Sequence, residues 1–270
     1  MSWVRILAPL SGGTGDAAVL AAAAQIARPF GAEVRAAYAP ADVADLMPWM
    51  GEGFMGGVQI AAVESLKEAA IEGQRAAEAA VAAHADGRSS FVALQSPVWS
   101  ALSMEARLSD VVVFDDEAAR GRGPLATAFQ ELIADEQRPI VVARTGLKAD
   151  GVIALAWDGG KEATRAVRTA LPLLEKAARV VILSAPGSSS RDFNPQALQA
   201  YLEARGVKAE VMVQRGSGDA GPILLNSAKA IGANLLVAGA FGHPRLQEFI
   251  FGGTTRTLLN GDAPSLFLSH

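Results

Sequence analysis

Short apolar runs alternate with longer amphipathic runs along the whole chain. In the front half, the runs 4–10, 33–39 and 110–114 predict strands, and the alanine-rich stretches 17–29 and 58–85 predict helices. Strands that alternate with helices are typical of βαβ units, whose strands pair in parallel. The pattern therefore predicts an α/β fold built on a parallel sheet.

The same order of elements begins again after residue 150. A predicted strand at 151–157, a helix at 162–176 and a strand at 179–184 repeat the start of the chain. The repetition indicates that one fold has been duplicated. Three pairs of segments align: Ser11-Gly12-Gly13 with Asp158-Gly159-Gly160, Asp110 to Val113 with Asn234 to Val237, and Pro139 to Val142 with Pro264 to Phe267.

The two copies differ in length. The spacing between aligned segments becomes shorter after the first strand, which places an insertion at 40–57 and in the long helix behind it. We expect one domain at 1–146 and a second at 150–270, joined by the segment 145–150. Each domain is expected to be a five-stranded parallel-sheet αβα unit of the Rossmann-like kind, with strand order 3-2-1-4-5.

The fifth strands of the two copies, 139–143 and 264–268, are apolar and would lie at sheet edges. An exposed apolar edge is an aggregation hazard and is normally covered. We therefore expect these two strands to pair with each other, so that the chain forms an internal pseudo-dimer.

The strongest chemical signal lies in the second half. Gly239-Ala240-Phe241-Gly242 is followed, after nine residues, by Gly252-Gly253-Thr254-Thr255. The first glycine ends a predicted strand and the second group begins a predicted helix. Ligands of open α/β sheets bind outside the carboxyl ends of strands, where glycine backbone and a helix N-terminus can receive phosphate. Asp158 ends the neighbouring first strand and can accept hydrogen bonds from a ribose or a base.

This arrangement resembles the motif of the universal stress protein family, and the duplication resembles its tandem two-domain form. The resemblance covers nearly the whole chain in topology, whereas the glycine motif occurs only in the second half. It implies a stress-response regulator that binds ATP or AMP, with Mg²⁺ as a companion ion and at most slow hydrolysis. The nucleotide-binding residues that it implies are Ala156, Asp158 and Ala185 at the adenine end, and Gly239, Gly242, Gly252, Gly253, Thr254 and Thr255 at the phosphates. One departure is Gly253, where the family usually has serine or threonine.

The first half lacks this motif. Ser11 stands at the position of Asp158, and Asp115-Asp116-Glu117 stands where the phosphates would lie. Three carboxylates beside a triphosphate are strongly unfavourable. We therefore expect the first domain to be a scaffold that binds no nucleotide.

Composition narrows the range of functions. The chain has no cysteine, which excludes disulfides and thiolate metal sites, and its net charge of −4 and 6% aromatic content argue against nucleic-acid binding. The three histidines have no metal-ligand spacing. The longest apolar run, 17–24, is shorter than the ~20 residues of a membrane span, and we expect a cytoplasmic protein that binds no membrane.

Three further hypotheses remain open. An interaction module that binds no nucleotide and works through its surfaces is the main alternative. The turn Ser11-Gly12-Gly13-Thr14-Gly15-Asp16 is similar to the phosphate loop of ATP pyrophosphatases, although Asp16 is displaced by one residue. The insertion carries Met47, Trp49 and Phe54, an apolar flap that either contacts a partner in a homodimer or packs on its own domain.

Overall fold

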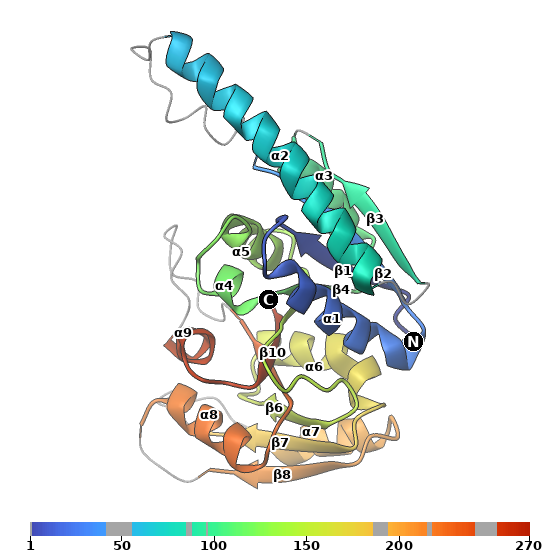
Figure 1. The fold of residues 1–270 in the computed structure, drawn as a ribbon. Coiled ribbons are helices and arrows are strands. Elements are labelled where there is room, and N and C mark those ends of the chain that lie inside the picture. The colour runs from blue at the N-terminus through green and yellow to red at the C-terminus, as the bar shows by residue number, and fades with distance from the viewer. Residues whose placement is uncertain are drawn as a thin grey trace.

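The computed structural model describes residues 2–41, 56–84, 88–95, 97–185, 194–214, 218–240 and 253–270. Within these residues, ten strands form one sheet in the order β3-β2-β1-β4-β5-β10-β9-β6-β7-β8, covered by helices (Figure 1). The predicted flap residues Met47, Trp49 and Phe54 lie outside the described residues.

The first half contains five strands in the predicted order 3-2-1-4-5, all paired in parallel. A short helix, α4, directly follows the fourth strand. The elements are β1 (Arg5–Leu10), α1 (Asp16–Ala27), the 3-10 turn η1 (Arg28–Phe30), β2 (Glu33–Tyr38), α2 (Gly56–His84), β3 (Ser89–Ala93), α3 (Val98–Arg107), β4 (Val111–Phe114), α4 (Asp116–Ala119), α5 (Ala126–Ala134) and β5 (Ile140–Val142).

The second half repeats this order, with its strands again parallel and arranged 3-2-1-4-5. The Rossmann-like prediction is confirmed for both copies. The elements are β6 (Val152–Ala156), α6 (Lys161–Leu174), β7 (Arg179–Ser184), α7 (Pro195–Glu203), β8 (Ala209–Val213), α8 (Ala220–Ala230), β9 (Leu235–Gly239), α9 (Gly253–Asn260) and β10 (Ser265–Ser269).

The two fifth strands join the halves. β5 and β10 pair antiparallel, with Val141 opposite Phe267 and Val142 opposite Leu266. The predicted pairing of these two apolar edges is thereby confirmed. Because the described strands within each half are parallel, the antiparallel β5–β10 pair relates the halves as a pseudo-dimer within one chain.

The hydrophobic core does not stop at this junction. One buried apolar cluster lies on the face that carries α1, α2, α6 and α7, and another lies on the face that carries α3, α5, α8 and α9. Each cluster contains side chains from both halves. The aromatic rings of Phe30, Trp3 and Phe267 form a continuous row across the junction, with centroid distances of 5.1 and 6.2 Å.

The connection between the halves is packed into this core. Leu147 and Ala149 are buried in the cluster on the α1 and α6 face. The side chain of Asn234, which precedes β9, donates to the Gly146 carbonyl at 2.9 Å and accepts from the Val152 amide at 3.0 Å. The connecting segment is therefore fixed to the second half and does not act as a free tether.

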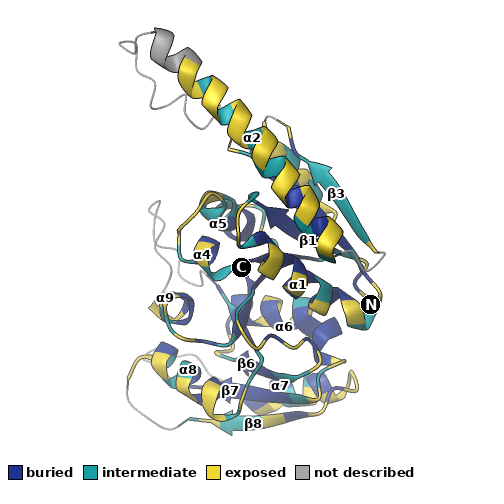
Figure 2. Ribbon diagram, viewed as in Figure 1, coloured by how far each residue is buried: buried dark blue, intermediate teal, exposed yellow. Residues whose placement is uncertain are grey.

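Helix α2 extends well past the other described helices and strands (Figure 1), and most of its described surface is exposed (Figure 2). Its last turns pack on α1 through the buried side chains of Ala77 and Val81. Ile71 of α2 is one of the exposed large apolar side chains among the described residues.

A surface ion pair gives the first half a pH-dependent contact. Glu136, in the turn after α5, accepts from Arg107 Nε at 2.8 Å and from Ser103, both on α3. Hydrogen bonds from Arg107 and Ser103 lower the pKa of Glu136 from its ordinary value of 4.5 to about 2. Because the folded pKa is depressed, the stabilisation is complete above pH 4.5 and is lost as the pH falls towards 2.

We expect Glu136→Gln to lower the free energy of unfolding slightly at pH 7 and to lose that difference near pH 2. The effect stays small because Arg107 is 60% exposed and solvent screens the pair. Urea unfolding of both proteins across this pH range measures the difference. A difference that is the same at pH 7 and pH 2 would show that the pair is not the source.

Candidate functional site

The predicted adenine-side residues lie at neighbouring strand ends. β6 lies between β7 and β9 in the sheet, so the carboxyl ends of these three parallel strands are adjacent. Ala156 ends β6, Ala185 follows β7, and Gly239 ends β9. Asp158 is exposed two residues beyond Ala156. The structure thus gathers these four predicted residues at one edge of the second half.

The turn after β6 has a defined hydrogen-bonded geometry. Asp158 Oδ1 accepts from the Gly160 amide at 2.8 Å, and the Trp157 amide donates to the Leu183 carbonyl of β7 at 2.8 Å. Gly160 is the N-cap of α6 and has no side chain to satisfy the first amides of that helix. The turn therefore places a carboxylate beside a helix N-terminus that carries positive partial charge.

Gly239 is required for packing at this edge. A Cβ atom at Gly239 would lie 2.6 Å from the Ala163 nitrogen and 2.7 Å from the Glu162 carbonyl carbon. The first turn of α6 therefore sits directly on the end of β9. This contact brings the α6 N-terminus and the end of β9 together at the place where the sequence predicts a ligand.

The predicted phosphate side is described in part. Gly253 begins α9 and is exposed, and no other described residue has a heavy atom within 4 Å of the position where a Cβ would stand. Thr254 is exposed, whereas Thr255 is buried. Gly242 and Gly252 lie outside the described residues. Thr254 and the first amides of α9 can therefore face a ligand, but the Thr255 side chain is not presented to solvent.

Trp157 is a residue at this edge that the sequence reasoning missed. It lies between Ala156 and Asp158 and packs against the cluster on the α6 face. Its indole Nε1 is buried and has no hydrogen-bond partner among the described residues. A buried indole N–H usually has a partner. The sequence signal that could have identified Trp157 is its position between the end of β6 and Asp158.

In the first half, helix α2 covers the corresponding carboxyl ends of the strands. A Cβ at Gly12, in the turn after β1, would lie 2.5 Å from Gly73 Cα of α2. Tyr38, at the end of β2, donates to the Ala70 carbonyl of α2 at 3.1 Å. Helix α2 therefore covers the ends of β1 and β2. The corresponding strands of the second half, β6 and β7, carry the predicted adenine-side residues.

The acidic segment of the first half has a different role from the one expected. Asp115 caps α4 by accepting from the Ala118 amide at 2.8 Å. Asp116 pairs with Arg120 at 2.5 Å and with Arg144 at 2.6 Å, and Glu117 pairs with Arg122 at 2.6 Å. Arginines neutralise two of the three acids, so their charge alone gives less reason to exclude phosphate than the sequence suggests.

The Asp16 side chain is hydrogen-bonded to the backbone of the loop that precedes it. It is buried, Oδ1 accepts from the Ser11 amide at 3.0 Å, and Oδ2 accepts from the Gly12 amide at 2.8 Å. Burial raises the pKa of Asp16, while these hydrogen bonds lower it. Both carboxylate oxygens serve to close the turn, which argues against the role of this acid in an ATP pyrophosphatase.

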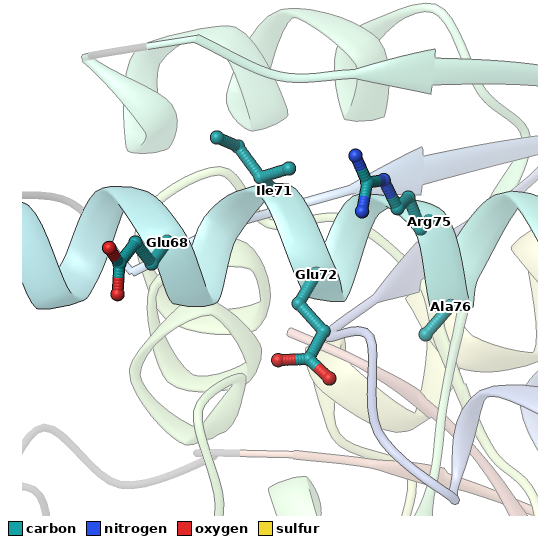
Figure 3. A pocket seen from close by; sticks show the side chains of 5 residues that line it. All are labelled: Glu68, Ile71, Glu72, Arg75 and Ala76. Atoms are coloured by element: carbon teal, nitrogen blue, oxygen red, sulfur yellow. The ribbon is translucent and has the colours of Figure 1, made fainter.

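A shallow depression on α2 is lined by Glu68, Ile71, Glu72, Arg75 and Ala76, all from one helix (Figure 3). Figure 3 shows Ile71 and Arg75 pointing to one side of the helix and Glu72 to the other. In the described part of the chain, no three acidic or histidine side chains are placed to hold a metal, and no helix is long and apolar enough to cross a membrane.

Comparison with known proteins agrees with this topology. Residues 151–261 match the family model described as the Universal stress protein family. A universal stress protein from Archaeoglobus fulgidus DSM 4304 has a similar structure, with a TM-score of 0.60 at 16% identity over 98% of this chain and 95% of that one. A functionally unknown protein from Pseudomonas aeruginosa PAO1 has a TM-score of 0.56 at 13% identity over 99% and 92%. No curated protein matches the chain. The structural likeness spans both halves and shows a shared fold.

Proposed function

Because residues 151–261 form a domain of the universal stress protein family, we propose that this chain is a stress-response protein that binds an adenine nucleotide, ATP or AMP, in its second half. The observation that carries the proposal is the strand edge where Asp158, the α6 N-terminus and the end of β9 lie together. Exposed helix N-termini bind phosphate, and a carboxylate accepts hydrogen bonds from ribose hydroxyls.

In this proposal, the adenine end lies beside Ala156, Asp158 and Ala185. The phosphates lie along the glycine-rich segment and α9, which supply Gly239, Gly242, Gly252, Gly253, Thr254 and Thr255. The Thr255 side chain itself is buried. Mg²⁺ would be held chiefly by the phosphates and water, as is usual for this ion.

We also propose that the chain divides into domains at 1–146 and 150–270 and that the first binds no nucleotide. The support is the cover that α2 places over β1 and β2, together with the contact between Gly12 and Gly73. Helix α2 would have to move away from β1, β2 and Gly12 before a ligand could enter. In this proposal the first domain therefore binds no nucleotide and serves as a scaffold. A cytoplasmic location and a homodimer formed through Met47, Trp49 and Phe54 belong to the same proposal.

Calorimetry of the full chain with ATP and AMP tests the proposal. We expect binding with one nucleotide per chain, weakened about ten-fold or more in Asp158→Ala because the lost hydrogen bonds involve a charged acceptor. Asp150→Ala is the matched control, since Asp150 is an exposed acid at the opposite end of the same strand. Its affinity should equal that of the unmodified protein.

Release of bound nucleotide is a second measurement. The purified protein is denatured and the supernatant is chromatographed, and adenine nucleotide is the expected product. A clean supernatant together with no heat of ATP binding would exclude the nucleotide site. The alternative of a nucleotide-free interaction module, for which the exposed α2 offers a surface, would then stand.

A further inference from the structure

Arg144 leaves the first half and reaches into the second. It follows β5, and its side chain is only 9% exposed. Nη2 donates to the Leu259 carbonyl at 2.7 Å, and Nη1 donates to the Leu258 carbonyl at 3.2 Å, both in the last turn of α9. Nη1 also lies 3.4 Å from the carbonyls of Ala263 and Pro264, in the turn before β10.

These contacts satisfy groups that a helix cannot satisfy itself. The last carbonyls of a helix have no internal partner, and the C-terminus carries negative partial charge. A guanidinium offers five donors in a fixed plane and is suited to bind several carbonyls at once. Arg120 adds a further contact by donating to the Asn260 carbonyl at 3.1 Å. Two arginines of the first half thus hold the C-terminal end of α9.

An acid of the first half fixes both arginines. Asp116, the first residue of α4, binds Arg144 Nε through Oδ1 at 2.6 Å and Arg120 Nε through Oδ2 at 2.5 Å. In Figure 1, α4 and α9 lie beside each other next to β10. Asp116 stands where the second half has its glycine-rich segment, so the first copy uses this position to hold its neighbour.

We propose that Arg144 and Asp116 are positioning residues for the phosphate-binding helix of the second half. The inference rests on the proposed function, in which the N-terminus of α9 receives phosphate. α9 has only eight residues, so a clamp on its last turn also fixes the direction of its first amides. The first half thereby takes part in nucleotide binding without touching the nucleotide, because small displacements of such donors are costly.

Arg144→Lys tests the clamp in the full chain. Lysine keeps the positive charge but lacks the planar fork, so charge is held constant while geometry is lost. We expect the affinity for ATP to fall about ten-fold, within the usual range of coupling between separate sites, and the affinity for adenosine to stay unchanged. We also expect faster amide hydrogen exchange in residues 253–260 of the ligand-free variant.

Asp116→Asn is a second and milder variant. It keeps the shape of the side chain, and it should change ATP affinity and α9 exchange in the same direction as Arg144→Lys but by less. The combined variant should lose less than the sum of the two single losses, because both residues belong to one network. Arg122→Ala is the control: Arg122 pairs with the adjacent Glu117 on the surface, and neither measurement should change.

The outcomes separate this inference from the proposed function. If the unmodified chain binds no ATP, the proposed function fails and the positioning role fails with it, although exchange in α9 still reports whether Arg144 holds the helix. If the chain binds ATP but Arg144→Lys binds it equally well, only the positioning role is overturned. The same holds if adenosine affinity falls as much as ATP affinity, since the effect would then be general.

Discussion

We expect Phe267→Ala to lower the free energy of unfolding by about 3–5 kcal/mol, the usual cost of truncating a fully buried phenylalanine. Phe267 lies in β10 with no exposed surface and stacks on Trp3 at an interplanar angle of 11°. Trp3 belongs to the first half, and Phe267 belongs to the last strand of the second. The cavity would therefore open at the junction where the two copies meet.

The effect should reach both halves because they share one core. Val141 of β5 stands opposite Phe267, and the apolar cluster that holds Phe267 also contains α1 and α6 side chains. Urea unfolding, followed by tryptophan fluorescence and by far-ultraviolet circular dichroism, measures the loss. We expect the two signals to change together in a single transition.

Phe267→Leu is the control, since it removes less volume and retains an apolar side chain. Its cost should be well below that of alanine. Two separate transitions in the unmodified chain, or a loss below about 1 kcal/mol in Phe267→Ala, would contradict the idea that the junction is a continuous core.

The architecture could be predicted because it depends on periodic patterns. Buried parallel strands give short apolar runs, and the repetition of those runs after residue 150 revealed the duplication. The pairing of β5 with β10 followed from the need to cover two apolar edges. These arguments use only local hydrophobicity and general rules of sheet assembly.

The contacts between elements could not be predicted in the same way. The sequence shows only that Asp116 carries a negative charge. Its partner Arg144 is 28 residues away and becomes a neighbour only after β4 pairs with β5. The contact of Gly12 with Gly73 depends on how α2 crosses the end of the sheet. The first half therefore kept its expected scaffold role in our proposal, but for a different physical reason: α2 covers its edge.

Gly239→Ala is expected to lower the free energy of unfolding by about 2–3 kcal/mol, in the range of overpacked cores. The added methyl would lie 2.6 Å from the Ala163 nitrogen and 2.7 Å from the Glu162 carbonyl carbon. Both are backbone atoms in the first turn of α6, so no side chain can rotate away. The helix N-terminus must instead move off the end of β9.

The same displacement should abolish nucleotide binding, because it separates the α6 N-terminus and the turn of Asp158 from the end of β9. Gly253→Ala is the matched control within the same motif. Among the residues that the structure describes, no heavy atom of another residue lies within 4 Å of its Cβ position. We expect Gly253→Ala to keep the affinity for ATP and to keep or slightly raise stability, since alanine favours a helix by up to about 1 kcal/mol over glycine.

Thermal unfolding without ligand separates the two roles of Gly239. If Gly239 is needed for packing, Gly239→Ala melts earlier than the unmodified chain before any nucleotide is added. Equal melting temperatures with lost ATP affinity would mean that glycine is needed there only for the approach of phosphate. The structure favours the first result, because the crowding around Gly239 comes from α6 itself.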